Sequence, residues 1–486
     1  MKRKEDRAAR RMSGDNNTAV YDAGPGHAAF LGGKGSLCKG FSRARSLQGL
    51  CPSALWASPR GIFERVKRDA SLKLKTAMTS FYLTFLVTEG PLPGMEVSKR
   101  IAGLTGGGSD GWDILRKSRE MIAAGVDVVE LTIGEHDRRT EPEILDEMAR
   151  SARLGHTGYA ALPGTDTLRD AIAARVSERT GVATARENVV VTPGAQSALF
   201  AAHVAACDPG DVALFIDPYY ATYPGTIRGV GAVARAVSAR AEAGFQPDAR
   251  DLDAAAKGAR SLLINSPNNP TGVVYTRETM DGIADVAKAH DLWIISDEVY
   301  DTQLWTGAHV SPRQLPGMAE RCLVAGSLSK SHAMTGSRLG WIVGPAEAME
   351  HVENLSTHTT YGVPGFIQDA GLFALQQGPA FEERIGAPFR RRHAAVLAYL
   401  TERGLPVVPS SASMYLMVDV RRTGLSGEAF AERLLGEHHI AVMPGESFGH
   451  AAAGHLRVAL TVEDSRLMDA IRTLANVVES LSADAA

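Results

Sequence analysis

A short stretch of this chain places a lysine among small hydroxyl side chains. Residues 326–344 read GSLSKSHAMTGSRLGWIVG, which sets Lys330 beside Ser327 and Ser329, with Arg338 eight positions later. A lysine amine can form a Schiff base with an aldehyde cofactor, and hydroxyls, backbone amides and a guanidinium can hold the phosphate of that cofactor. The alternative interpretation of the same residues is a basic loop before a buried strand at residues 339–343. Other parts of the chain must therefore decide between the two.

Short apolar runs alternate with helical patterns before and through this stretch. Helical segments at residues 195–206 and near residues 280–289 separate some of the runs. Near-continuous apolar strands joined by helices predict an α/β fold with a mainly parallel sheet that is covered on both faces. Ligands of such sheets bind beyond the carboxyl ends of the strands, so the motif after each run is a candidate site. The runs are VVVT, VALFID, VARAV, SLLINS, LWIISDE, CLVAGS and WIVG.

The motif TPGAQSALF follows the first run and predicts a phosphate site. It puts Gly194, Ala195 and Gln196 at the start of a helix. Free N–H groups and the helix dipole favour a phosphate there, and the small side chains leave those amides accessible. A strand-to-helix turn that uses glycine for steric reasons is the alternative interpretation.

Three later runs end in groups that suit a flat, charged ring. PYYATYP offers three aromatic faces, Tyr219, Tyr220 and Tyr223, one of which could stack on the ring. PNNPTG offers Asn269 as a donor to an oxyanion. SDEVY supplies Asp297 and Tyr300. A carboxylate at a strand end is costly to bury unless it meets a cation, and a protonated pyridine nitrogen is such a cation.

Two more candidates precede the alternating region. Residues 126–133 predict a strand that ends at Gly134, where a ligand can approach the backbone closely. Tyr159 lies in a loop before a helix that is expected to start near Thr165, and this loop could edge an active site. A packed surface aromatic is the alternative for Tyr159.

These groups together suit one cofactor with an aldehyde, a phosphate, a phenolic oxygen and a ring nitrogen, which describes pyridoxal phosphate (PLP). From about Met95 to the C-terminus the sequence resembles the class I/II aminotransferases of fold type I. The resemblance implies a large, mainly parallel-sheet domain that binds PLP at residues 141–374. It also implies a smaller α+β domain built from residues 95–140 and 375–486.

The resemblance implies a role for each candidate residue. Lys330 would hold the cofactor and move a proton between the substrate Cα and the cofactor C4′, while Asp297 would hold the proton of the ring nitrogen. Asn269 and Tyr300 would bond the phenolic oxygen. The remaining contacts would be Tyr220 and Val299 on the two ring faces, Gly194, Ala195, Gln196, Ser327 and Arg338 at the phosphate, and Tyr159 of the partner subunit.

Substrate binding and the reaction are also implied by the resemblance. GHLRVALT supplies Arg457 for the substrate α-carboxylate, which needs a fork-shaped, permanently charged group. Gly134 and Asn269 would meet the substrate as well. The expected activity is a ping-pong transfer of an amino group from an α-amino acid to a 2-oxo acid such as pyruvate. The expected enzyme is a cytoplasmic homodimer with shared active sites, and no metal, nucleic acid or membrane is expected to take part.

Several segments resemble the arginine–pyruvate transaminase type within the family. They include HDLWIISDEVY, SLSKSHAMTG and RRTGLSGEAFAERLL. The segment GEHDRRT departs from the GDPD or GEPD of relatives, with His136 in place of proline and Arg138 in the expected pocket-edge region. The added positive charge of Arg138 would oppose the guanidinium of an arginine substrate. In a separate departure, Ala412 and Ser413 replace a glycine pair near Arg457. An aspartate or aromatic aminotransferase and a PLP-dependent C–S lyase are the alternatives.

The first 94 residues differ from the rest of the chain. They carry 16 Lys/Arg against 7 Asp/Glu, whereas the remainder carries 36 against 48. This segment has no sustained periodicity, which predicts that it is largely disordered. It could be a basic tail, an Arg/Ser-rich targeting peptide, or an extension that results from a start codon set too far upstream, with Met95 as the natural beginning. A DNA-binding module fused to an aminotransferase-like sensor is a further alternative, although no recognisable pair of helices supports it. The four cysteines form no CxxC pair, so a reducing cytosolic compartment is expected.

Overall fold

The computed structural model describes residues 96–107 and 111–484 of the 486-residue chain. The predictions for residues 1–94, including the DNA-binding alternative, lie outside the described residues. Within the described ranges, no helix combines the length and the apolar character that a membrane crossing requires.

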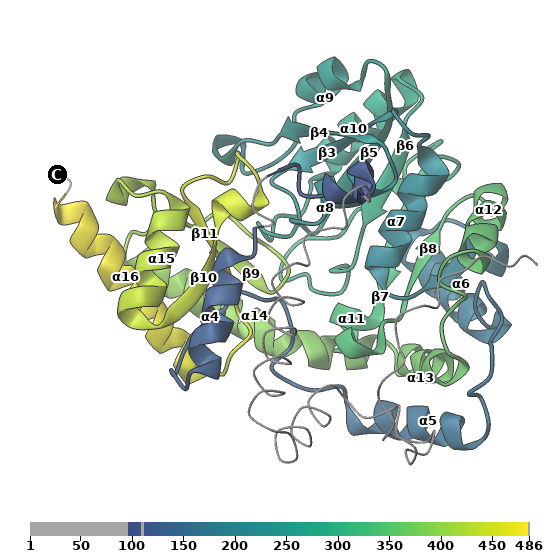
Figure 1. Ribbon diagram of the computed structural model, residues 1–486, viewed down its shortest axis with the longest axis horizontal. Coiled ribbons are helices and arrows are strands. Elements are labelled where there is room, and N and C mark those ends of the chain that lie inside the picture. The colour runs from purple at the N-terminus through teal and green to yellow at the C-terminus, as the bar shows by residue number, and fades with distance from the viewer. Residues whose placement is uncertain (1–95, 108–110, 485–486) are drawn as a thin grey trace, which may run out of the picture. The chain divides into compact units, whose positions relative to one another are not determined.

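A seven-stranded sheet organises the larger part of the fold (Figure 1). Its strand order is β2-β8-β7-β6-β5-β3-β4, and every pair from β7 to β4 is parallel. Strand β8 runs antiparallel to both β7 and β2. The mainly parallel α/β sheet predicted from the apolar runs is therefore confirmed. The strands are β2 (Val189–Thr192), β3 (Val212–Asp217), β4 (Val233–Ser238), β5 (Ala259–Asn265), β6 (Trp293–Asp297), β7 (Cys322–Ser327) and β8 (Gly340–Val343).

Helices cover both faces of this sheet because successive strand residues point to opposite sides. In β2, Val190 belongs to one apolar core, while Val189 and Val191 belong to the core on the other face. The first core also takes side chains from α7 (Ala195–Ala206), α8 (Tyr223–Gly229) and α12 (Ala346–Thr357). The second takes side chains from α5 (Pro142–Arg153), α6 (Asp166–Thr180), α9 (Ala249–Ala256), α10 (Arg277–Ala289) and α13 (Gly365–Gln376). The short helix α3 (Lys99–Ala102) packs on α8.

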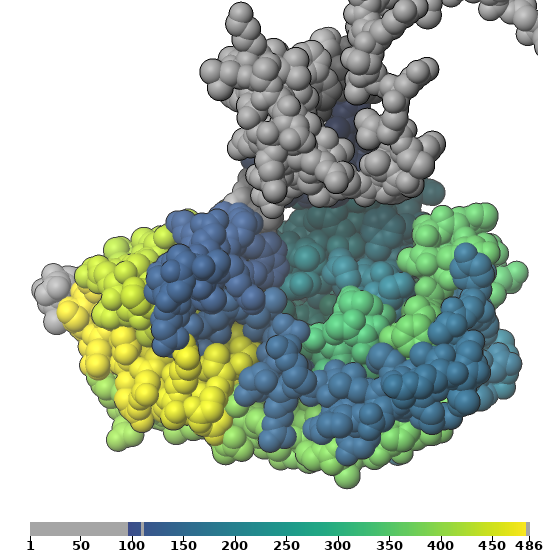
Figure 2. All heavy atoms as spheres, turned by 60° about the horizontal axis from the view of Figure 1, so that its bottom comes forward, coloured from purple at the N-terminus to yellow at the C-terminus, as the bar shows by residue number. Residues whose placement is uncertain are grey.

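A second, four-stranded sheet joins distant parts of the sequence. Strand β1 (Val129–Leu131) pairs in parallel with β10 (Ile440–Pro444), and β11 (His455–Ala459) and β9 (Tyr415–Asp419) follow antiparallel. One apolar core links this sheet to α4 (Asp113–Ala123), α14 (Pro379–Glu402), α15 (Gly427–His438) and α16 (Asp464–Asp484). In Figure 2 the blue residues that include α4 lie against the yellow C-terminal segments. The predicted domain boundaries at residues 140 and 375 stay a prediction.

The predicted elements differ from the observed ones mainly at their ends. The strand expected over residues 126–133 is reduced to Val129–Leu131, because only these residues pair with β10. The residues that follow it, Ile133 and Gly134, line a cavity instead. Helix α10 begins earlier than expected, since Thr276 caps it by accepting a hydrogen bond from the Thr279 N–H at 3.1 Å.

Candidate active site

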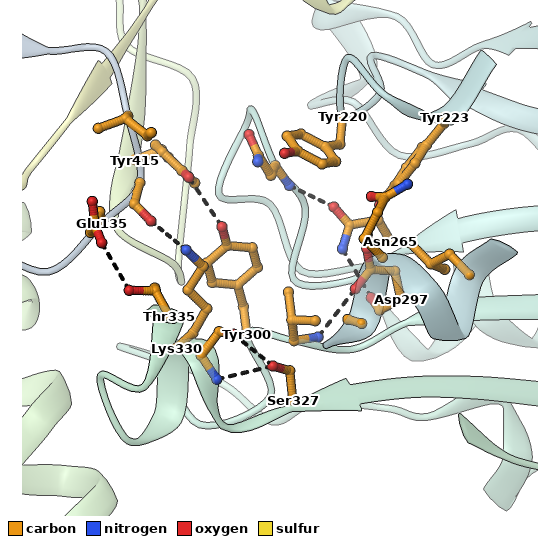
Figure 3. A pocket seen from close by; sticks show the side chains of 18 of the residues that line it. Glu135, Tyr220, Tyr223, Asn265, Asp297, Tyr300, Ser327, Lys330, Thr335 and Tyr415 are labelled. Atoms are coloured by element: carbon orange, nitrogen blue, oxygen red, sulfur yellow. Dashed lines mark hydrogen bonds between the residues drawn. The ribbon is translucent and has the colours of Figure 1, made fainter. Parts of the chain in front are cut away.

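The carboxyl ends of five parallel strands meet at one cavity of about 310 Å³ (Figure 3). This volume lies at the lower end of the range for small-molecule sites, roughly 300–1,000 Å³. The smaller sheet closes the cavity with Gly134 after β1 and Arg457 on β11. The lining residues from the large sheet follow β2, β3, β5, β6 and β7, and they include Ala195, Gln196, Tyr220, Asn269, Asp297, Tyr300, Ser327 and Lys330.

Lys330 is held on a single helical turn directly after β7. This turn, α11 (Leu328–Ser331), is capped by Ser327, whose hydroxyl oxygen accepts a hydrogen bond from the Ser329 N–H at 3.0 Å. The Lys330 Nζ donates to the carbonyl oxygen of Gly134. Burial lowers the pKa of Lys330 to about 8, although the nearby Glu135 carboxylate opposes this shift. About one tenth of the amine is therefore uncharged and nucleophilic at pH 7, far more than for an ordinary lysine.

Asp297 is a buried carboxylate at the end of β6. Its Oδ2 accepts a hydrogen bond from the Tyr223 hydroxyl at 2.7 Å, and its Oδ1 accepts one from the Val299 N–H at 3.3 Å. Burial raises the pKa of Asp297 to about 6, and the bond from Tyr223 opposes this shift. Among the described residues no Lys, Arg or His forms a salt bridge with it, so the site has a buried acid that lacks a cation.

The opposite end of the cavity is suited to a phosphate. Helix α7 begins at Ala195, so its first amides are free of helical partners. Gly194 has a φ of 79°, and a Cβ there would lie 2.3 Å from Nη2 of Arg338. Only glycine lets the guanidinium approach the backbone so closely. Arg338 itself has a φ of 52°, and its Nη1 donates to the Thr335 carbonyl oxygen at 3.0 Å.

Arg457 is fully enclosed at the side of the cavity that faces the smaller sheet. Its Nη1 donates to Oδ1 of Asn269 at 2.8 Å, and its Nη2 donates to the Thr132 carbonyl oxygen. The rings of Tyr415 and Phe448 each lie with their centroids 4.4 Å from the guanidinium carbon. The Nε of Arg457 has no hydrogen-bond partner among the described residues. The buried guanidinium thus keeps a donor for a carboxylate.

The cavity collects most of the residues that the sequence singled out. Lys330, Asp297 and Tyr300 line it, as do all the other proposed cofactor and substrate residues with two exceptions. Gly194 lies behind the lining and supports Arg338. Tyr159 is 90% exposed and packs edge-on against Tyr361, with ring centroids 4.9 Å apart, so within this chain it does not reach the cavity.

Several lining residues carry contacts that sequence patterns did not reveal. Tyr223 stood only as one of three tyrosines in PYYATYP, yet it holds Asp297. Asn265 donates to the Asp297 carbonyl oxygen at 2.9 Å. Tyr415 is far away in sequence, and its hydroxyl lies 3.1 Å from that of Tyr300. No local signal could identify such pairs, because they depend on how separate strands are packed.

The interpretation of the GEHDRRT segment is corrected by the structure. Arg138 is exposed and does not line the cavity, so it adds no positive charge to the lining. Glu135 lines the cavity instead and accepts a hydrogen bond from the Thr335 hydroxyl at 2.9 Å. His136 is buried, with its ring edge-on to Phe389 at 5.1 Å, and burial lowers its pKa to about 3. The expected repulsion of a guanidinium by Arg138 is therefore wrong for this chain.

Comparison with curated proteins gives a consistent set of relatives. The chain is 41% identical over 382 residues to the arginine–pyruvate transaminase of Pseudomonas aeruginosa, covering 78% of this chain and 96% of that protein. It is 35% identical over 366 residues to the aspartate/prephenate aminotransferase of Thermus thermophilus, covering 74% of this chain and 94% of that protein.

Solved structures and family profiles agree with these relatives. An aspartate aminotransferase from Thermus thermophilus, solved with maleate, superposes with a TM-score of 0.74 at 34% identity, over 79% of this chain and all of that chain. The profile described as "Aminotransferase class I and II" matches residues 126–474, which include the cavity residues from Ile133 to Arg457. With its mainly parallel sheet and its relatives, this chain belongs to the class I and II aminotransferases.

Proposed function

We propose that this aminotransferase uses PLP, as its family does, and that the cavity holds the cofactor. The proposal rests on one cavity that brings together three groups: the amine of Lys330 with its lowered pKa, the buried carboxylate of Asp297 without a cation, and the buried guanidinium of Arg457 with a free donor. Lys330 would bond the aldehyde, Asp297 would meet the ring nitrogen, and Arg338 with the start of α7 would hold the phosphate. Bound there, PLP supplies a ring that withdraws electrons from the substrate Cα.

The chain's own residues divide the work around the substrate. Arg457 and Asn269 bind and orient the α-carboxylate, which sets the direction of the Cα–H bond. Lys330 Nζ would be the base that moves the proton between the substrate Cα and the cofactor C4′. Tyr223 keeps Asp297 ionised by donating to it, and Asp297 then keeps the ring nitrogen protonated. Arg457 is itself buried, which strengthens its attraction for the substrate carboxylate.

We infer that the amino donor is arginine and that pyruvate is the acceptor. The relative that is 41% identical is an arginine–pyruvate transaminase. Four of the charged residues that line the cavity have partners in this scheme: Lys330, Asp297, Arg338 and Arg457. Glu135 is the remaining one, and its carboxylate suits a guanidinium. Other relatives are aspartate aminotransferases, so an aspartate-specific enzyme is the second candidate.

Single-turnover reactions with a panel of amino acids test this assignment. The PLP-loaded enzyme is mixed with arginine, ornithine, aspartate, phenylalanine or alanine, and the loss of the cofactor absorbance band is followed. Arginine should react fastest, by about ten-fold or more over aspartate, because Glu135 would attract the guanidinium of arginine and repel the side-chain carboxylate of aspartate. Faster conversion of aspartate would overturn the arginine assignment. Release of ammonia without formation of alanine from pyruvate would instead indicate a lyase.

We also propose a homodimer in which Tyr159 of the partner subunit completes each site. The loops and helix around α5 expose several large apolar side chains that a second copy would cover: Leu145, Leu154, Tyr159 and Tyr361. Mixing Lys330→Ala subunits with Tyr159→Ala subunits tests this. A shared site predicts that the mixed dimer regains activity, since one of its two sites carries neither change. Activity no higher than half that of the Tyr159→Ala enzyme would contradict it.

The buried free thiols of Cys207 and Cys322 support the proposed cytoplasmic location.

A further inference from the structure

Tyr415 lies between Arg457, the proposed substrate-binding residue, and Tyr300, a proposed cofactor-binding residue. It is the first residue of β9, pairs with Ala459 of β11, and is 2% exposed. Its ring lies on the Arg457 guanidinium, with the centroid 4.4 Å from the guanidinium carbon. Its hydroxyl lies 3.1 Å from the Tyr300 hydroxyl, and Figure 3 shows the two tyrosines meeting beside Lys330.

The backbone of Gly134 fixes the Tyr415 hydroxyl in this place. A Cβ on Gly134 would lie 1.7 Å from the Tyr415 hydroxyl oxygen, so only a glycine leaves room for it. The carbonyl oxygen of the same glycine accepts a hydrogen bond from Lys330 Nζ. The hydroxyl is therefore confined between Gly134 and Tyr300, within the group that surrounds the lysine.

We propose that Tyr415 is a positioning residue with two separable functions: its hydroxyl orients the Tyr300 hydroxyl, and its ring holds the Arg457 guanidinium. The inference rests on the proposed PLP site. Tyr300 has one proton to donate, and a hydrogen bond donated by Tyr415 to the Tyr300 oxygen leaves that proton for the phenolic oxygen of the cofactor. Hydrogen bonds in such a chain strengthen one another, so Tyr415 makes Tyr300 a better donor.

The ring has a separate effect on Arg457. Tyr415 and Phe448 enclose the guanidinium from two sides, with both centroids 4.4 Å from its central carbon. Burial lowers the pKa of Arg457, and the neighbouring tyrosines oppose this shift. A cation between two aromatic faces is stabilised by the ring quadrupoles and loses freedom to rotate. The ring therefore presents the remaining N–H groups to the substrate carboxylate.

The variant Tyr415→Phe tests the hydroxyl, because it keeps the ring. The measurement is a pH titration of the absorbance band of bound PLP. Weaker donation from Tyr300 leaves more negative charge on the phenolic oxygen of the cofactor. That charge stabilises the proton on the nitrogen that would join Lys330 to the cofactor. The midpoint of the titration should therefore rise by about half to one pH unit. The KM values for amino and 2-oxo acids should stay within about two-fold of the wild-type values, since the ring remains. A midpoint equal to that of the wild-type enzyme would overturn the role of the hydroxyl.

The variant Tyr415→Leu tests the ring. Loss of the aromatic face should raise the KM for both the amino donor and the oxo acid by about ten-fold. An unchanged KM would overturn the role of the ring, and melting curves identify any variant that is merely unfolded. Tyr275→Phe is the matched control for Tyr415→Phe, because Tyr275 is also 2% exposed but does not line the cavity. The midpoint of its titration should equal that of the wild-type enzyme. Failure of the proposed function is distinct, since the wild-type enzyme itself would then show no band of bound PLP.

Discussion

The Lys330→Ala enzyme should lose transamination by about 10³-fold or more, because alanine can neither bond the cofactor aldehyde nor move the Cα proton. The wild-type amine is prepared for both tasks by burial, which lowers its pKa to about 8. The measurement is the rate of alanine formation from pyruvate under saturating amino donor.

A second readout for this variant does not depend on turnover. Borohydride reduction of the PLP-loaded wild-type enzyme should add the mass of the cofactor to the peptide that contains Lys330, and the variant should show no such addition. Lys288→Ala is the control, since Lys288 lies on the exposed side of α10 and pairs with Asp285 at 3.0 Å. Transamination at the wild-type rate in the Lys330→Ala enzyme would refute the assignment.

The Asp297→Asn enzyme should lose activity and gain stability when it is free of cofactor. An amide places no negative charge at the ring nitrogen, so turnover should fall by about 10²- to 10³-fold. Stability should change in the opposite direction. In the cofactor-free enzyme Asp297 is a buried acid without a cation, and the free energy of unfolding should increase by about 1–3 kcal/mol at pH 8 when it is made neutral.

The sign of the stability effect follows from the two pKa values of Asp297. Its ordinary value is 3.8, and burial raises the pKa to about 6 in the folded protein. The unfolded chain therefore releases this proton at lower pH, and stability is lost as pH rises from about 4 to about 6. Denaturation of the cofactor-free enzymes at pH 4 and pH 8 should give a difference between variant and wild type only at pH 8.

An exposed carboxylate provides the comparison for this experiment. Asp285→Asn on α10 changes the same charge at a side chain that is 77% exposed, and its stability effect should be small at both pH values. Equal stability of wild-type and Asp297→Asn enzymes at pH 8 would show that Asp297 is not held at a cost in the cofactor-free fold.

The active site concentrates features that a stable fold would avoid. Arg338 adopts a left-handed backbone conformation, with a φ of 52°, and Asp297 is buried without a cation. The Arg457 Nε is buried without a partner among the described residues. Such features destabilise a protein by about 1–3 kcal/mol each and persist where the surrounding structure holds them. A ligand with a ring cation and a carboxylate would satisfy the last two, whereas the backbone conformation of Arg338 would remain and hold its guanidinium at the phosphate end of the cavity.

Sequence periodicity was sufficient to predict the large sheet and to locate the motifs at its edge. The apolar runs that became β2, β3, β5, β6 and β7 are local patterns, and the rule that ligands bind at the carboxyl ends of parallel strands places their motifs together. Lys330, Asp297 and Ala195 could be identified in this way. The end of the strand over residues 126–133 could not, because it depends on pairing with β10.

The sequence by itself determined which reactive groups this protein possesses and in which order they follow the strands. Only the tertiary structure decided which of them share a cavity. Tyr223 meets Asp297 across 74 positions of sequence, and Tyr415 meets Tyr300 across 115. Glu135 faces the cavity while Arg138 faces solvent, although three positions separate them. The physical reason is that local periodicity sets the direction of a side chain only within its own strand or helix, whereas contacts across the cavity depend on how separate elements pack.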